Sequence, residues 1–139
     1  MEDKSGITGM KDTKIKLTPQ RSAILEYFEG NTSHPSAEDI YKAVKERYPM
    51  VSFATVYNTL SRLKELGEVW ELTIDDERKR YDPNTATHHH LLCLKCRKIV
   101  DIHHDFDLSF PDEQTQGFKV TGCHVEFYGL CQECVAGEV

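Results

Sequence analysis

The chain has 139 residues, 39% hydrophobic and 29% charged, which is enough for one ordinary domain or two small ones with a modest core. No apolar run approaches the roughly 18 residues of a membrane span, and the N-terminus lacks an apolar signal region, so we expect a cytoplasmic protein with no membrane partner. Five cysteines in such a protein indicate metal ligands or redox thiols rather than a disulfide framework.

The net charge of −6 argues against a non-specific polyanion binder. Its distribution is uneven, because residues 1–82 carry 13 basic and 15 acidic side chains, whereas residues 83–139 carry 4 and 8. The first 25 residues contain five basic and three acidic side chains, so this stretch is locally basic. Charge alone therefore decides neither for nor against DNA as a partner.

Two helices are predicted near the N-terminus, after a frayed or short helical arm up to about residue 16. Thr18-Pro19 is typical of a helix start and Gly30 of a helix end, so the first helix spans the residues between them. Ser36 to Asp39 resembles a capping box that begins a second helix, and Pro49 ends it.

A third helix is predicted from Ser52 to Gly67, with two distinct faces. Phe53, Val56, Leu60 and Leu63 form the buried stripe at helical spacing. The opposite face has small, hydrogen-bonding or cationic side chains of the kinds that read base edges or phosphates in a major groove. These candidate DNA-binding residues are Ala54, Thr55, Tyr57, Asn58, Ser61 and Arg62. From this helix alone, a solvated amphipathic face is the alternative interpretation.

The remaining pattern predicts strands. Residues 68–74 and 79–82 would form a hairpin after the three helices, which is the order of a winged helix-turn-helix. Residues 83–87 are predicted to be a hinge linker, followed by strands over 89–93, 98–102 and 118–128, with a short helix in the polar segment 104–117. The expected fold class is α+β, with a DNA-binding domain at 1–82 and a small α/β domain at 88–139.

Two Cys-x-x-C pairs supply four thiolates, the ligand set of a closed structural zinc site. They are Cys93, Cys96, Cys131 and Cys134. The alternative is a pair of redox dithiols, although neither pair follows a strand and opens a helix as in a thioredoxin-like unit. The fifth cysteine, Cys123, is interpreted as a packed or free thiol.

Histidines and carboxylates near the linker suggest a second metal site. His88 and His90 project to one face of a strand, and His89 projects to the other. His88 and His90, together with Asp82 and Asp101, form a nitrogen and oxygen environment suited to Fe²⁺ or Mn²⁺. Spacing alone does not bring His34 into this group, and His103, His104 and His124 are interpreted as surface histidines.

Several motifs together resemble the Fur (ferric uptake regulator) superfamily, over nearly the whole chain from about residue 17 to 134. They are Thr18-Pro-Gln-Arg21, the stretch from His34 to Tyr41, Ala54-Thr-Val-Tyr57, Arg80-Tyr-Asp82, His88 to Cys96 and Tyr128 to Cys134. The resemblance implies a metal-dependent transcriptional repressor that is a homodimer, with a winged helix and an α/β dimerisation domain.

The resemblance also implies roles for individual residues. The structural zinc ligands would be the four cysteines of the two pairs, and the regulatory ligands for Fe²⁺ or Mn²⁺ would be His34, Asp82, His88, His90 and Asp101. Asp82 and Asn58 are similar to the peroxide-sensing (PerR) branch of the family, whose iron-sensing members usually carry Glu and Arg there. Arg97 departs from the pattern, because Gly usually follows the first Cys-x-x-C.

The function expected from this resemblance is a repressor that binds double-stranded operator DNA with metal bound. Hydrogen peroxide would release it through iron-catalysed oxidation of His34 or His88. The nearest alternative is an iron-dosage repressor without peroxide sensing. A zinc adaptor that binds another protein is a further alternative. An enzyme is not expected, since the sequence contains no His-Glu-x-x-His or nucleophile motif.

Overall fold

In the computed structural model of the protein, residues 15–137 are described, so the predicted N-terminal arm lies almost entirely outside them. The chain divides into two compact units, one ending at Ala86 and the other beginning at Thr87. Helices and small sheets occur together, which confirms the α+β class. Within residues 15–137, no helix has the length and apolar composition of a membrane span.

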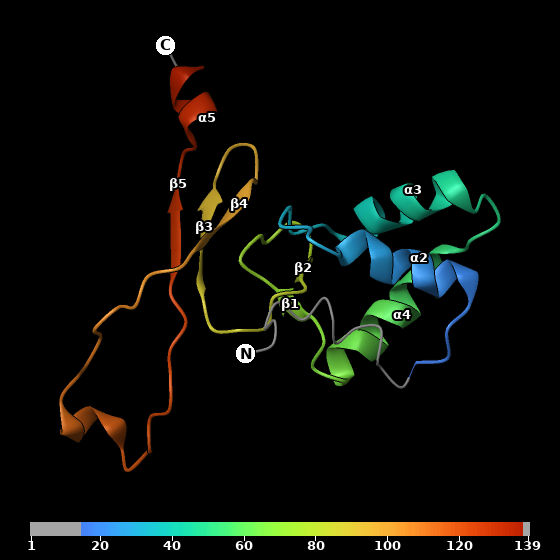
Figure 1. The fold of residues 1–139 in the computed structure, drawn as a ribbon. Coiled ribbons are helices and arrows are strands. Elements are labelled where there is room, and N and C mark those ends of the chain that lie inside the picture. Colours follow the sequence, from blue (N-terminus) through green and yellow to red (C-terminus); the bar gives the residue numbers. More distant parts are fainter. Residues whose placement is uncertain (1–14, 138–139) are drawn as a thin grey trace. The chain divides into compact units, whose positions relative to one another are not determined.

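Three helices build the first unit (Figure 1), namely α2 (Pro19–Phe28), α3 (Ala37–Arg47) and α4 (Phe53–Glu65). Each begins where a side chain caps it. The hydroxyls of Thr18, Ser36 and Ser52 each accept a backbone N–H from three residues ahead. In α3 the cap is reciprocal, because the backbone N–H of Ser36 donates to the carboxylate of Asp39 at 3.0 Å.

The three helices contact one another around a single apolar core. Its fully buried members include Ile24, Phe28, Ile40, Val56 and Leu60. A short antiparallel hairpin follows, made of β1 (Trp70–Leu72) and β2 (Arg80–Asp82), with Trp70 paired to Asp82. Three helices and a hairpin are the predicted winged-helix order.

The prediction that Phe53 belongs to the buried stripe of α4 is wrong. Val56, Leu60 and Leu63 are fully buried, but Phe53 is 40% exposed. It is the first residue of the helix, one turn before the first fully buried residue, Val56. Its ring instead stacks on Tyr57, with centroids 6.4 Å apart, and meets Tyr41 edge-on.

A three-stranded sheet in the order β4-β3-β5 forms the second unit. Strand β3 (His89–Cys93) pairs antiparallel with β4 (Ile99–Ile102) and parallel with β5 (Glu126–Gly129). A 3₁₀ turn, η1 (Asp112–Thr115), lies in the long connection to β5, and α5 (Gln132–Ala136) follows β5 (Figure 1).

One prediction for the second unit is wrong in extent, and one of its helices was not predicted. The strand predicted over 118–128 is confined to β5, and Phe118 is 78% exposed. The reason is that β3 has only five residues and four of them already pair with β5, so a single β3 residue, His89, remains to extend the ladder before Glu126. Helix α5 was not predicted, because its five residues are too few to show a helical period.

Candidate metal centres and nucleic-acid interface

The four cysteines of the two pairs converge in the second unit. Cys93 ends β3, Cys96 lies in the turn before β4, Cys131 is the N-cap residue of α5 and Cys134 lies in its first turn. The expectation that neither pair follows a strand and opens a helix is therefore wrong for the second pair, because β5 ends at Gly129 and α5, too short to show a helical period, begins at Gln132. All four sulfur atoms lie within 4.8 Å of one another, and the Sγ atoms of Cys96 and Cys131 are 3.7 Å apart. A tetrahedral zinc site with Zn–S bonds of about 2.3 Å separates its sulfurs by about 3.8 Å, so the donor set and its spacing fit zinc.

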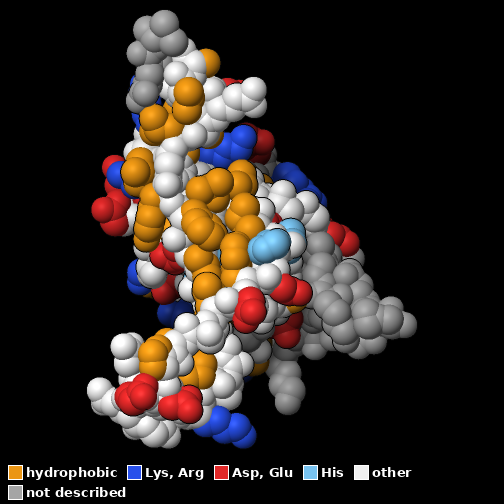
Figure 2. Space-filling model, turned by 90° about the vertical axis from the view of Figure 1, so that its left-hand side faces the viewer, with side chains coloured by type: hydrophobic (Ala, Val, Ile, Leu, Met, Phe, Trp, Pro, Cys, Tyr) orange, Lys and Arg blue, Asp and Glu red, His pale blue; other side chains and the backbone are white. Residues whose placement is uncertain are grey.

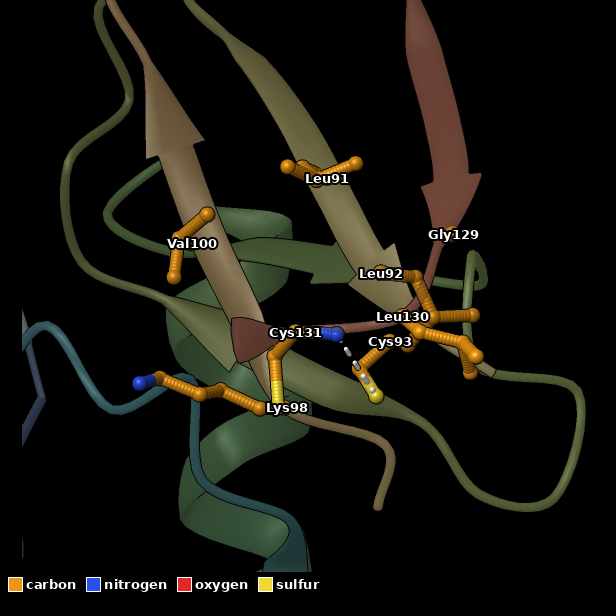
Figure 3. Close-up of a pocket in the computed structure, with 8 residues that line it drawn as sticks. All are labelled: Leu91, Leu92, Cys93, Lys98, Val100, Gly129, Leu130 and Cys131. Atoms are coloured by element: carbon orange, nitrogen blue, oxygen red, sulfur yellow. Dashed lines mark hydrogen bonds between the residues drawn. The ribbon is translucent and has the colours of Figure 1, made fainter. Parts of the chain in front are cut away.

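Backbone N–H groups prepare this cluster for a cation. The N–H of Cys131 (3.4 Å, Figure 3) and that of Cys96 (3.5 Å) both donate to the sulfur of Cys93 and lower the pKa of its thiol to about 5. The pKa of Cys134 is raised to about 12, first because its thiol shares a hydrogen bond with Cys131. Four crowded sulfurs therefore resist ionising together unless a cation neutralises them.

The turn between β3 and β4 requires one residue in the left-handed backbone conformation. Arg97, where the family usually has Gly, adopts φ +67°, and its backbone N–H donates to the carbonyl of Cys93 at 2.9 Å. The departure noted in the sequence thus falls on a position where Gly would be favoured. The turn nevertheless forms, and it carries Cys96 back toward Cys93.

In the first unit, His34 and Asp82 form a buried pair. The Nε2 atom of His34 lies 3.5 Å from Oδ2 of Asp82, and the other carboxylate oxygen, Oδ1, accepts the backbone N–H of Asn84 at 2.9 Å. His34 has a positive φ of +54° in the turn before α3. The hairpin holds this turn, because the N–H of Tyr81 donates to the carbonyl of Pro35.

In the second unit, two histidines face one carboxylate. His90 in β3 pairs directly with Asp101 in β4, and the Nε2 atoms of His88 and His90 lie 3.1 Å and 3.4 Å from Oδ1 of Asp101. Strand alternation turns His89 away, and its Nδ1 accepts the N–H of Val125 at 3.0 Å. The predicted regulatory residues therefore form two clusters, one in each unit, each with imidazole and carboxylate donors of the type that Fe²⁺ and Mn²⁺ prefer.

One histidine interpreted as a surface residue has a more specific place. Nε2 of His124 lies 3.2 Å from Nδ1 of His90, and Nδ1 of His124 lies 3.8 Å from Oε2 of Glu126. Burial, followed by the neighbouring His90, lowers the pKa of His124. The sequence held no signal for this contact, because 34 residues separate the two histidines.

The candidate DNA-binding side chains lie on the surface of α4. Five of the six are exposed and the sixth, Thr55, is half-buried. Asn58 and Arg62 also line a hollow of about 290 Å³ together with Lys16 and Arg21. Three cationic residues and an amide around one hollow suit the phosphate backbone of a nucleic acid. The sequence had indicated a basic N-terminal stretch but had not connected it with this helix.

Comparison with known proteins agrees with this organisation. The model of the ferric uptake regulator family matches residues 12–128. A curated relative, the peroxide operon regulator of Bacillus subtilis, is 44% identical over 96% of this chain and 93% of its own length. It is thus a regulator, not an enzyme, that this chain resembles.

Two solved structures are similar in fold and sequence. The peroxide stress regulator of Campylobacter jejuni has a TM-score of 0.64 and 32% identity, and the match covers 92% of this chain and 98% of that one. The iron-bound ferric uptake regulator of Francisella tularensis has a TM-score of 0.70 and 26% identity, covering 88% and 96%. The protein described here therefore belongs to the ferric uptake regulator family of transcriptional regulators.

Proposed function

We propose that the protein is a metal-dependent repressor that binds operator DNA as a homodimer. It dissociates from the DNA when hydrogen peroxide oxidises a ligand of its regulatory metal. The observation that carries the proposal is the division of the candidate ligands. His34 and Asp82 lie in the first unit, whereas His88, His90 and Asp101 lie in the second. Similarity to a peroxide operon regulator supports the choice of signal.

The four cysteines hold structural Zn²⁺ in this proposal. Their sulfur spacing fits a closed tetrahedral site, which leaves no position for a substrate. The site links the end of β3, the first strand of the second unit, to the start of α5, its last helix. In a domain this small, the binding free energy of zinc becomes folding free energy.

The five nitrogen and oxygen ligands hold one Fe²⁺ or Mn²⁺ ion. The first unit offers two of these ligands and the second offers three, and neither number alone reaches the coordination that these metals prefer. A bound metal ion would therefore couple the two units across the segment 83–87. A metal that binds one arrangement of the units better than others shifts the population toward it. By linkage, DNA that prefers the same arrangement tightens metal binding by the same factor.

The exposed face of α4 enters the major groove of the operator. Asn58 and Arg62 are the residues we assign to base edges, and Lys16 and Arg21 extend the surface toward phosphates. Two such helices in a dimer would read two half-sites.

The second unit supplies the dimer contact. Figure 2 shows hydrophobic side chains gathered on one face of the molecule. Exposed apolar residues of this unit include Phe127 and Tyr128 of β5 and Leu130 just beyond it. Such a surface is favourable only when covered, and a second copy of the same unit would cover it symmetrically.

Peroxide sensing depends on which metal is bound. Fe²⁺ held by these residues would catalyse a reaction in which hydrogen peroxide gives one oxygen atom to an adjacent imidazole ring, oxidises that ring by two electrons and leaves as water, whereas Mn²⁺ reacts with peroxide poorly. His34 or His88 would gain one oxygen atom and lose its metal-binding lone pair. The units would then be released from the DNA-binding arrangement. An iron-dosage repressor is the alternative, in which iron switches DNA binding but no histidine is oxidised.

The test begins with a duplex selected from a random-sequence library by the Mn²⁺-loaded protein. DNA affinity is then measured with Fe²⁺ or Mn²⁺, before and after low-dose hydrogen peroxide, and tryptic peptides 22–42 and 81–95 are analysed by mass spectrometry. We expect a one-oxygen increment on His34 or His88 with iron only, together with loss of DNA binding. Asp101→Ala should abolish metal-dependent binding. Unmodified peptides with intact iron switching would support the iron-dosage repressor instead.

A further inference from the structure

The two ring nitrogens of His90 face different neighbours within the second unit. Nε2 lies 3.4 Å from Oδ1 of Asp101, and Nδ1 lies 3.2 Å from Nε2 of His124. We propose that His124 is a positioning residue, which accepts the Nδ1 proton of His90 and thereby keeps the Nε2 lone pair of His90 available to the regulatory metal. This inference rests on the proposed function, since it assigns a role toward the same metal.

The argument follows from where a neutral imidazole carries its single N–H. A metal ligand must present a lone pair, so a metal at Nε2 requires the proton at Nδ1. In the other tautomer Nε2–H would donate to Asp101, and that proton would stand where the metal must bind. An acceptor beside Nδ1 favours the first tautomer, and Nε2 of His124 is at hydrogen-bonding distance.

His124 is itself oriented for this role. If its Nε2 accepts, its own proton must be on Nδ1, and Nδ1 lies 3.8 Å from Oε2 of Glu126. A carboxylate opposite that N–H favours the required tautomer of His124. The result is an ordered series from His90 through His124 to Glu126, in which each ring donates from Nδ1, and the lone pair on Nε2 of His90 stays beside Asp101 for the metal.

The backbone next to His124 lies before the start of β5, but hydrogen bonds to β3 fix its position. Nδ1 of His89 accepts the N–H of Val125 at 3.0 Å, and the N–H of His90 donates to the carbonyl of Val125 at 3.3 Å. Glu126 is paired in register with His90. His89, whose ring faces away from Asp101, thus anchors the segment that delivers His124 to the back of His90.

Direct titration of the regulatory site tests the proposal. Protein with its four-cysteine site filled with zinc is titrated with Mn²⁺, and bound Mn²⁺ is followed by electron paramagnetic resonance. His124→Leu removes the acceptor and should weaken Mn²⁺ binding about 10- to 100-fold, the usual effect of losing such a partner. His124→Gln places an amide oxygen near the same position and should restore most of the affinity. His104→Leu is the matched control, because His104 is an exposed histidine that packs on Phe106.

The outcomes separate this inference from the proposed function. If the wild type binds no Mn²⁺, or if Asp101→Ala binds it equally well, the proposed function fails. If Asp101→Ala abolishes binding while His124→Leu stays within about twofold of the wild type, only the role of His124 is overturned. Equal losses in the Leu and Gln variants would also overturn it, because they would indicate packing rather than proton acceptance.

A measurement on the wild type avoids dependence on variants that fold poorly. Long-range ¹H–¹⁵N spectra of the protein with diamagnetic Zn²⁺ also in the regulatory site report which ring nitrogens of His90 and His124 carry protons. We expect Nδ1–H on both rings, with Nε2 of His124 unprotonated because it accepts the proton of His90. A proton on Nε2 of His124 would contradict the proposal, whatever the variants show.

Discussion

The Arg80 guanidinium donates a hydrogen bond through Nε to the backbone carbonyl of His34. Arg80 lies in β2 and is buried, and its Nη1 also forms a 2.9 Å ion pair with the buried carboxylate of Asp75. One side chain of the wing thus holds the turn that carries His34 in its left-handed conformation. The position of a proposed metal ligand therefore depends on a residue that binds no metal.

Replacing Arg80 by Met should be costly for the first unit. The substitution leaves the Asp75 carboxylate buried without the guanidinium, a loss of about 3–5 kcal/mol in the free energy of unfolding. Denaturant titration of the zinc-loaded protein measures it. Lys79→Met is the neighbouring control, because Lys79 is exposed and its 3.8 Å ion pair with Glu71 should contribute less than about 1 kcal/mol. Equal midpoints for the two variants would contradict the role given to Arg80.

Loss of one cysteine of the cluster should release zinc and loosen the second unit. For Cys96→Ser we expect the zinc content to fall from about one ion per chain to well below it, with loss of cooperative unfolding of this unit. Metal analysis and thermal unfolding with and without a chelator are the measurements. Cys123→Ser is the matched control, since Cys123 is exposed and lies outside the cluster. Zinc retained in the Cys96 variant would argue against the four-sulfur site.

The groove-facing assignment of α4 predicts a specific loss of operator affinity. Replacing both Asn58 and Arg62 by Ala should weaken binding by about 30-fold or more, since two good base or phosphate contacts of about 1–3 kcal/mol each contribute at least about 2 kcal/mol together. Fluorescence anisotropy with the selected duplex measures this at fixed salt. Lys42→Ala removes one exposed charge from α3 and should change the affinity by less than about threefold. Unchanged affinity in the double variant would remove α4 from the interface.

The turn at Arg97 predicts a stabilising substitution. A residue with a side chain at φ +67° is strained by about 1–2 kcal/mol, part of which the greater chain entropy of an unfolded glycine offsets. Arg97→Gly should therefore be about 1 kcal/mol more stable than Arg97→Ala, a comparison in which both variants lack the arginine side chain. Unfolding of the zinc-loaded proteins gives the difference. A more stable Ala variant would show that the turn relaxes out of the left-handed region.

Much of the local structure could be predicted because its causes lie within a few residues of one another. Thr18, Ser36 and Ser52 cap the helices that the sequence predicts, and β3 has the predicted bounds His89–Cys93. The predictions that failed involve ends and short elements. Phe53 is apolar, but its contacts with Tyr41 and Tyr57 leave it 40% exposed, and β5 pairs with only four residues of β3.

The sequence by itself determined the ligand chemistry of this protein. Two Cys-x-x-C pairs and alternating histidines specify sulfur donors for one metal and nitrogen and oxygen donors for another, since ligand type follows from residue identity. Only the tertiary structure decided which side chains meet. The register of β3 and β4 places His90 opposite Asp101, and the anchoring of the chain before β5 brings His124 to the other nitrogen of His90. Strand register and long-range contacts depend on packing between distant segments, which no local pattern encodes.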